Sequence, residues 1–442
     1  MAVLSRQSRS VHLTVTVRSS GHHGSVTGAS CRRPTLSGMT RTVDLVYFNA
    51  GGGHRAAAQA LQAVLQQRHG PALQVRLVNL MAVLDAQDRF RRLTGMAPED
   101  VYNRRLARGW TLGLAQELKL LQASVRWAHP WLVRLLQAHW AETRPDVVVS
   151  LIPNFNRCLY ESVQAARPGT PCATVLTDLA DTPPHFWIEP GQDQWIVCGT
   201  ERAVQQALAQ GVAARNVHRV SGMILRPAFH AVAPLDAAAR AAALQALGLQ
   251  PGRPTGLVMF GGQGSMQMLR IARSLPQVQL ILACGHNALL AERLRALPVP
   301  EGGAARAVLG FTPDVVRYMQ LADFFVGKPG PGSLSEAVQM GLPVITFENR
   351  WTMPQERYNA QWVREQGLGE VVPSVKAIAG GVARLLADLP AAQARVRGVR
   401  NQAVFEVADL VDQRLIQARA PHPQPLAHPA SAVTGEIGRA HV

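Results

Sequence analysis

The sequence predicts an α/β protein with two doubly wound, Rossmann-like domains that face a central cleft. Short apolar segments of strand length alternate with helical segments along most of the chain, and this alternation restarts after residues 226–229. Gly-rich loops follow several of the predicted strands. Buried strands that alternate with helices are typical of parallel sheets, whose ligands bind beyond the carboxyl ends of the strands. We therefore expect the ligand between the two domains.

The first predicted domain spans residues 39–225 and contains five clear strand patterns. Its strands are expected at 43–48, 74–80, 146–151, 173–178 and 194–199. The segments between or after them have helical patterns, at 55–69, along a long region from 84 to 141, at 156–167 and at 200–210. The strands are short and apolar, which favours a sheet covered on both faces.

The second predicted domain spans residues 226–420 and begins with a linker around Arg226 and Pro227. An Ala/Leu-rich helix is expected at 235–248. Five strands follow, each with a helical segment after it, at 255–260, 278–284, 306–310, 323–327 and 343–347. The repeated order of strand and helix predicts a second parallel sheet.

Both ends of the chain differ in composition from the middle. Residues 1–38 are rich in Ser, Arg, Gly and His and lack periodicity, so we expect a disordered tail, with Met39 as the natural start. An organellar transit peptide is the alternative. Residues 421–442 are dominated by Pro, Ala and His and are also expected to be disordered, and residues 436–442 resemble translated sequencing adapter.

Composition excludes several classes of protein. No apolar run reaches the roughly 18 residues of a membrane-spanning helix, which excludes an integral membrane protein. The five cysteines form no CxxC pair, so neither a disulfide framework nor a zinc site is expected, and a reducing compartment fits. The net charge of +16 points to a polyanionic partner, which nucleic acid, an anionic membrane or phosphate would each satisfy.

The strongest chemical signal is the Gly-rich segment 327–345. A strand ends at Gly327, Lys328-Pro-Gly-Pro-Gly332 forms a turn, and a helix is expected to open at about Ser333. Glycines allow a ligand to approach the backbone, and the helix N-terminus offers free N–H groups. This pattern suits a diphosphate, and Glu336 on the first helical turn is placed to bind a ribose diol. A tight turn with a helix cap is the alternative.

Two further Gly-rich loops follow strands. Gly51-Gly52-Gly53 precedes His54 at the start of a helix, where a histidine can act as a general base or simply cap the helix. The weaker loop runs from Gly261 through Gly262 to Ser265.

These loops, in this order, resemble the family of monogalactosyldiacylglycerol synthases and processive diacylglycerol glucosyltransferases. That family is related to the lipid-linked GlcNAc transferase of peptidoglycan synthesis. The resemblance covers about residues 43–415, and the segments that carry it are 51-GGGHRAA-57, 174-TVLTDL-179, 222-GMILRPAF-229, 328-KPGPGSLSEA-337 and 354-PQERYN-359. The chain departs from it at Pro329, where relatives usually have Ala.

The resemblance implies a GT-B fold and an inverting transfer from a UDP-sugar without an essential metal or other cofactor. By position, Phe311 lies near uracil, and the diphosphate is expected at Gly330, Gly332 and Ser333, with Lys328 adding charge. Glu336 is expected at the ribose, and Gln355 and Glu356 at the sugar hydroxyls with Asn359 supporting them. Gly262 is a further expected donor-side residue.

His54 occupies the position of the family's proposed acceptor-side catalytic histidine, and Gly52 and Gly53 are expected to line the acceptor site. Asp178, which ends a strand, is the second catalytic candidate; it is alternatively a loop cap. Relatives often have His-Pro-x-Trp after this Asp, whereas the corresponding residues here are displaced to His185 and Trp187. We expect Phe186 or Trp187 to line an acceptor pocket.

Residues 88–140 combine basic and aromatic side chains. They hold nine Lys or Arg against four Asp or Glu, a net +5, and four of the eight tryptophans, with Trp127, Trp131, Arg104 and Arg105 as candidate membrane contacts. Such a segment suits an anionic lipid surface; the alternative is ordinary helices with a solvated basic face and core tryptophans. No nucleic-acid reading motif accompanies the charge, so we expect no nucleic-acid partner.

The sequence as a whole predicts a hexosyltransferase that moves galactose or glucose from a UDP-hexose to a lipid hydroxyl, expected to be that of diacylglycerol. We expect peripheral attachment at the cytoplasmic face of a membrane. A polyprenyl-linked acceptor, a UDP-sugar 2-epimerase of the same fold, and a catalytically inactive lipid-binding protein are the alternatives.

Overall fold

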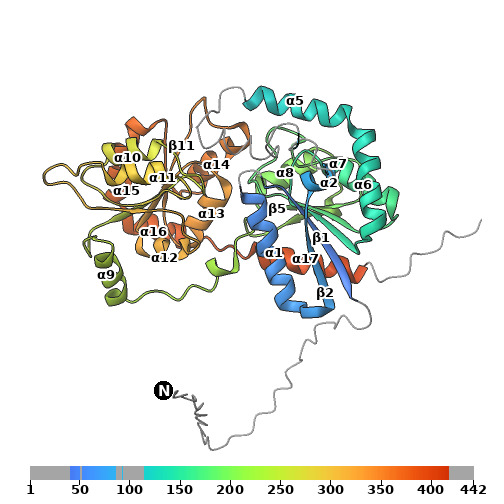
Figure 1. Ribbon diagram of the computed structural model, residues 1–442, viewed down its shortest axis with the longest axis horizontal. Helices are drawn as coiled ribbons and strands as arrows, with labels where there is room; N and C mark the ends of the chain where they lie inside the picture. The colour runs from blue at the N-terminus through green and yellow to red at the C-terminus, as the bar shows by residue number, and fades with distance from the viewer. Residues whose placement is uncertain (1–39, 50–51, 86–91, 93–113, 418–442) are drawn as a thin grey trace, which may run out of the picture. The chain divides into compact units, whose positions relative to one another are not determined.

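A computed structural model describes residues 40–49, 52–85, 92 and 114–417 of the chain (Figure 1). Several sequence predictions fall outside these residues. They are the two tails, Gly51, and the candidate membrane contacts Arg104 and Arg105.

The first sheet has six parallel strands in the order β2-β1-β3-β4-β5-β6. The strands are β1 (Arg41–Tyr47), β2 (Leu73–Asn79), β3 (Val147–Ser150), β4 (Cys172–Val175), β5 (Trp195–Cys198) and β6 (Val217–Arg219). All five strands predicted for this half are present, and β6 is an additional short edge strand. Strands β3, β4 and β5 are buried at every position, as expected for strands covered on both faces.

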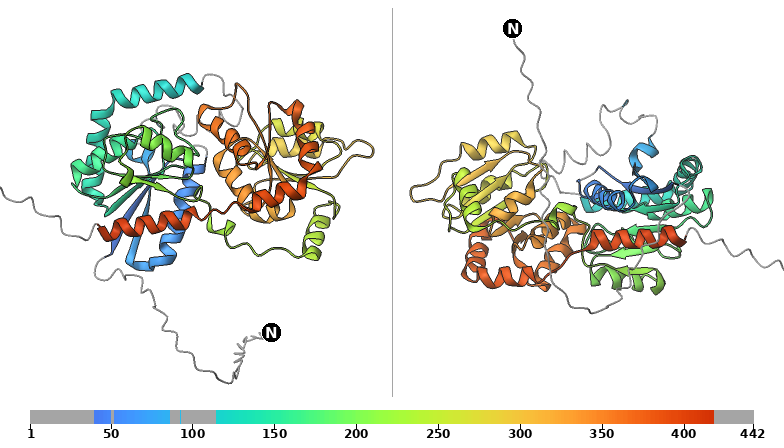
Figure 2. Two further views of the ribbon diagram at one scale, coloured as in Figure 1. Left: turned by 180° about the vertical axis from the view of Figure 1, so that it is seen from behind. Right: turned by 90° about the horizontal axis from the view of Figure 1, so that it is seen from below.

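Helices lie on both faces of this sheet (Figure 2). They are α1 (Gly53–His69), α2 (Leu80–Leu84), α5 (Leu114–Trp127), α6 (His129–Thr143), α7 (Asn156–Ala166) and α8 (Glu201–Ala209), with 3-10 turns η1 (Gly70–Ala72) and η2 (Ala214–Asn216). Within the described part of the long helical region predicted at 84–141, the chain forms two helices and turns at Ala128, just before Pro130. Proline fits the first turn of a helix but not its interior, which explains the break.

The second sheet also has six parallel strands, in the order β12-β11-β10-β7-β8-β9. The strands are β7 (Thr255–Met259), β8 (Gln279–Ala283), β9 (Arg306–Leu309), β10 (Phe324–Gly327), β11 (Val344–Phe347) and β12 (Gly369–Val372). The five predicted strands are confirmed, and β12 is an additional edge strand. Around the sheet lie η3 (Pro227–Phe229), α9 (Ala237–Ala246), α10 (Gln267–Ser274), α11 (Ala288–Arg295), α12 (Val315–Leu321), α13 (Pro331–Gln339), α14 (Pro354–Glu365), η4 (Val375–Ala377), α15 (Ile378–Ala387) and α16 (Leu389–Arg397).

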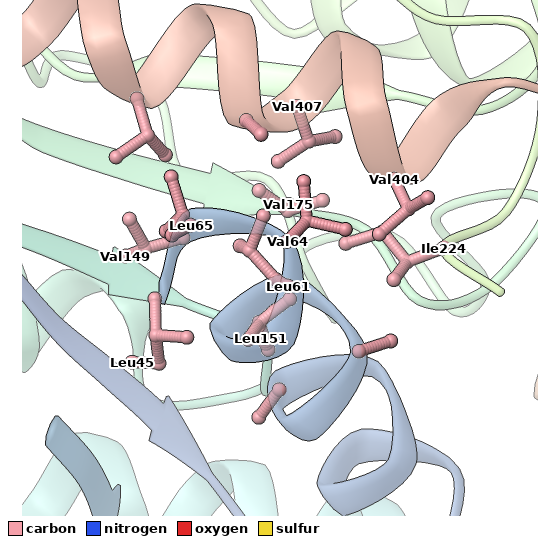
Figure 3. Close-up of a cluster of buried hydrophobic side chains, with 14 of the residues drawn as sticks. Leu45, Leu61, Val64, Leu65, Val149, Leu151, Val175, Ile224, Val404 and Val407 are labelled. Carbon is pink, nitrogen blue, oxygen red and sulfur yellow. The ribbon is translucent and has the colours of Figure 1, made fainter. Parts of the chain in front are cut away.

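The last helix, α17 (Ala403–Gln417), packs on the first sheet, although the sequence placed residues 226–420 in the second domain. Figure 3 shows Val404 and Val407 of this helix facing Leu61 and Val64 of α1. The apolar face of α17 must be buried away from water, and it packs against the apolar face of α1. Polar contacts fix the same packing. They are Arg68 Nη1 with Asp409 Oδ1 at 2.8 Å and the Ser221 backbone N–H with Glu406 Oε2 at 2.6 Å.

The packing of α17 predicts the effect of trimming its buried face. Leu415 is fully buried in the core of the first sheet, so Leu415→Ala should lower the free energy of unfolding by about 2–5 kcal/mol. Gln413→Ala on the exposed face of the same helix is the control and should change it by less than about 0.5 kcal/mol. Urea unfolding followed by circular dichroism measures both. Equal effects of the two variants would contradict the packing.

Candidate active site

A cavity of about 940 Å³ lies at the carboxyl ends of strands from both sheets. The loops after β1, β3 and β4 line one part of it, and the loops after β7, β9 and β10 line the other. Most of the residues singled out from the sequence line this cavity. They are Gly52, Gly53, His54, Asp178, Gly262, Phe311, Lys328, Gly330, Gly332, Ser333, Glu336, Gln355 and Glu356.

His54 is the second residue of α1 and contacts the loop after β4. Gly52 caps the helix in the left-handed conformation, with φ of 81°, which favours glycine at this point. The His54 Nδ1 atom is 2.8 Å from the Thr177 hydroxyl, and the ring packs beside Phe48 and Trp187. The pKa of His54 is lowered to about 4, because the effect of burial exceeds the opposite effect of a hydrogen bond with the Leu151 backbone. The imidazole is therefore neutral at pH 7.

Asp178 is a buried carboxyl group that follows β4 and lines the cavity. The Trp187 indole N–H donates to its Oδ2 atom at 2.9 Å. The pKa of Asp178 is raised to about 7, chiefly by burial. The negative charge of nearby Glu356 also raises this pKa, whereas the hydrogen bond from the Trp187 indole and the positive charge of Lys328 lower it. A base is most effective when its pKa lies near the working pH, so Asp178 has the acidity of a general base.

Phe186 and Trp187 take different positions. Phe186 lines the cavity, as expected from the sequence, whereas fully buried Trp187 lies behind the lining and holds Asp178. Asp181 fixes this segment because its carboxylate accepts the backbone N–H of Trp187 at 2.6 Å and that of His185 at 3.1 Å. The displaced tryptophan therefore positions a carboxyl group.

The Gly-rich loop after β10 leads directly into α13. The helix begins at Pro331, two residues before the predicted start, because proline is favoured in the first turn and Gly330 can act as the N-cap. A Cβ atom at Gly332 would meet no atom within 4 Å, so the backbone here is open to a ligand. The first N–H groups of a helix have no partner within the helix and suit an anion.

Two carboxylates and an amide surround this loop. Lys328 Nζ forms a 2.8 Å ion pair with Oε1 of buried Glu356. Burial raises the pKa of Glu336 to about 7, and Arg226 lowers it. Asn359 is absent from the cavity lining; it is fully buried, and its Nδ2 atom donates to the Pro329 carbonyl at 2.7 Å. Asn359 thus holds the loop from behind.

Phe311 offers a flat aromatic surface at the part of the cavity lined by the second sheet. It is 58% exposed and stacks on His286, with ring centroids 3.9 Å apart and an angle of 16° between the planes. The His286 backbone N–H donates to the Gly262 carbonyl at 2.8 Å, which links this pair to the loop after β7.

Sequence patterns assign no role to several polar residues of the cavity, among them Arg226 and Asn154. The Arg226 Nη1 atom donates to the Pro313 carbonyl at 3.3 Å, and its guanidinium group lies over the Phe229 ring at 5.1 Å. Segment 222–229 was identified as similar to the family, so a signal for Arg226 existed. Asn154 has no such signal in the sequence.

The part of the cavity beside the first sheet has a largely apolar lining. It includes Phe48, Met81, Leu118, Leu121, Phe155 and Phe186. Among the residues that the structure describes, no group of three or more His, Cys, Asp or Glu side chains is placed to hold a metal ion. The four described cysteines are buried free thiols.

Known protein families match both parts of the chain. The family profile for monogalactosyldiacylglycerol (MGDG) synthase matches residues 54–223, and that for the C-terminal domain of glycosyltransferase family 28 matches residues 257–413. Monogalactosyldiacylglycerol synthase 3 of Arabidopsis thaliana is 26% identical over 78% of this chain and 74% of its own length. The processive diacylglycerol beta-glucosyltransferase of Bacillus subtilis is 28% identical over 56% of this chain and 62% of its own length.

Two solved structures share the fold. MurG of Acinetobacter baumannii has a TM-score of 0.54 at 14% identity, covering 84% of this chain and 99% of that one. The UDP-GlcNAc 2-epimerase of Neisseria meningitidis has a TM-score of 0.51 at 12% identity, and the match covers 85% of this chain and 100% of that one. The fold alone therefore does not separate a transferase from an epimerase, but the sequence matches do.

The fold and the two sequence matches define a hexosyltransferase of the GT-B class. Residues 54–223 match the profile of MGDG synthase and residues 257–413 that of the family 28 C-terminal domain, which confirms the resemblance inferred from the motifs. The epimerase alternative is not favoured.

The charges around Asp178 predict a pH dependence. In Glu356→Gln, Asp178 loses a neighbouring negative charge, so the pKa of Asp178 should fall from about 7. Because a base works when deprotonated, the acid limb of the pH profile of kcat/KM should move to lower pH, by roughly one pH unit. Glu365→Gln on the same helix, α14, is the control and should leave the limb in place. If the acid limb of the kcat/KM profile stayed in place in Glu356→Gln, the limb would report the protonation of a group other than Asp178.

Proposed function

We propose that this enzyme transfers galactose or glucose from a UDP-hexose to the hydroxyl group of a membrane lipid, diacylglycerol. The observation that carries the proposal is the composition of the cavity, which joins a Gly-lined helix N-terminus to an apolar pocket. The first feature suits a sugar nucleotide and the second a lipid. The named activities of the Arabidopsis and Bacillus relatives support the same pairing.

The reaction is a single displacement with inversion at the anomeric carbon. Asp178 takes the proton of the acceptor hydroxyl. The hydroxyl oxygen then bonds to the anomeric carbon of the sugar, while the bond from that carbon to the diphosphate oxygen breaks. Asp178 suits this role better than His54, because a pKa near 7 makes a stronger base at neutral pH than one near 4. Neutral His54 would orient the hydroxyl by hydrogen bonding.

The departing UDP carries the electron pair of the broken bond and needs stabilisation. The N-terminal turn of α13 with Gly332 and Ser333, together with Lys328 and Arg226, would supply it from the protein, without an essential metal. Phe311 would lie against the base, Glu336 would bind the ribose, and Gln355 and Glu356 would bind the sugar hydroxyls. Asn359 supports the loop that bears these contacts.

The acceptor reaches the site from a membrane surface bound through α5 and α6. Leu120, Trp127 and Trp131 are 69%, 87% and 52% exposed, and Lys119, Arg126 and Arg134 are exposed on the same two helices. Leu121 is exposed on α5 and also lines the cavity, so apolar surface continues into the site. Exposed Trp with basic residues suits an anionic membrane, which we place at the cytoplasmic face. None of the described helices is long and apolar enough to span a bilayer.

A transfer assay tests the proposed function. Purified protein with diacylglycerol in anionic vesicles should move label from UDP-galactose or UDP-glucose into the lipid phase, and the effective nucleotide identifies the sugar. The rate should be unchanged by EDTA. Asp178→Asn should lower kcat at least about 100-fold while UDP binding is kept. UDP binding without labelled lipid in the wild type would reject this acceptor.

The membrane surface predicts a binding defect without a catalytic defect. The double variant Trp127→Ala, Trp131→Ala should bind anionic vesicles about tenfold more weakly or worse, because each side chain loses apolar area buried in the interface. Trp351→Ala removes a 47% exposed tryptophan next to the second sheet and is the control. Sedimentation with vesicles measures both, and transfer to a short-chain, water-soluble acceptor should be kept. Wild-type vesicle binding by the double variant would reject this surface.

A further inference from the structure

Asn154 has an unusual backbone for a residue other than glycine. It lies in the loop between β3 and α7, at the carboxyl edge of the first sheet, with φ of 68°. This left-handed region is costly for residues with a Cβ atom, and asparagine tolerates it better than most. Such conformations persist where surrounding contacts hold them, and they concentrate at functional sites.

Hydrogen bonds tie this loop to the segment that positions Asp178. The Asn154 backbone N–H donates to the Phe186 carbonyl at 2.6 Å. Two residues later, Asn156 Nδ2 donates to the Trp187 carbonyl at 2.8 Å, and the Ser150 hydroxyl donates to Asn156 Oδ1 at 2.6 Å. Asn154 is therefore fixed relative to Trp187, whose indole holds Asp178.

The Asn154 side chain is a polar group among apolar neighbours. It lines the cavity beside Pro153, Phe155 and Phe186. Its Oδ1 atom is buried and has no hydrogen-bond partner among the described residues, whereas a buried side-chain oxygen normally has one. A polar group in an apolar pocket sets the orientation of a bound ligand.

We propose that the Asn154 amide binds the oxygen-bearing head of the lipid acceptor and so turns its free hydroxyl group toward Asp178. The inference rests on the proposed function and names a specificity-determining residue for it. An amide has both N–H donors and an oxygen acceptor, so it can pair with an ester carbonyl and with a hydroxyl of one acceptor. The partner for the buried oxygen is then supplied by the substrate.

Two substitutions distinguish the effect of the Asn154 side-chain amide from that of its left-handed backbone. Asn154→Gly keeps the left-handed conformation and removes the side chain, so the protein should melt at the same or a higher temperature. With dioctanoylglycerol as the acceptor, its KM should rise about tenfold, and the KM for the UDP-hexose should change less than twofold. Asn154→Asp keeps the shape but loses the N–H donors, and it should also raise the acceptor KM.

The matched control is Arg144→Gly, which removes a side chain at another position of positive φ, the C-cap of α6, outside the cavity lining. It should leave both KM values unchanged. An unchanged acceptor KM in Asn154→Gly, or an equal rise for donor and acceptor, would overturn the inference while the proposed function stands. A wild-type protein that transfers no sugar to dioctanoylglycerol or diacylglycerol would instead overturn the proposed function and this inference with it.

Discussion

The buried Asp178 carboxyl group is the constraint around which the site is organised. Burial alone would keep it protonated, and the Trp187 indole donates a hydrogen bond that favours its charged form. Glu356 and Lys328, which follow strands of the second sheet, act on the same carboxyl group with opposite signs. The acidity of a group beside the first sheet therefore depends on charged residues that follow strands of the second sheet.

Much of the fold follows from local sequence patterns. Short apolar runs such as those at β3 and β10 are typical of buried strands, and parallel pairing then places the loops after them at one edge of each sheet. That is why Gly52, His54 and the segment after Gly327 could be assigned to a ligand site from the sequence. The edge strands β6 and β12 were missed because they are short and only partly buried, so their apolar pattern is weak.

Features that depend on distant parts of the chain could not be predicted in this way. The packing of α17 on α1 joins residues more than 300 positions apart, and its amphipathic pattern does not say which sheet it covers. The role of Trp187 depends on a loop held by Asp181, and the backbone of Asn154 depends on the Phe186 carbonyl. The bond from Asn154 to Phe186 is a tertiary hydrogen bond and the bond from Trp187 to Asp181 lies within one irregular loop, and neither leaves a periodic signal in the sequence.

The two substrates proposed for this enzyme differ in polarity, and the distribution of polar groups follows that difference. Around the helix N-terminus of α13, Lys328 pairs with Glu356, and Ser333 and Glu336 line the cavity, which suits a charged nucleotide. Around Phe155 and Phe186 the lining is apolar, so each polar group there has a large influence on ligand orientation. Recognition of the acceptor therefore rests on few atoms, and those atoms must be rigidly held. The left-handed backbone and the short hydrogen bond of Asn154 meet that requirement, which gives a physical reason for keeping a costly conformation at this position.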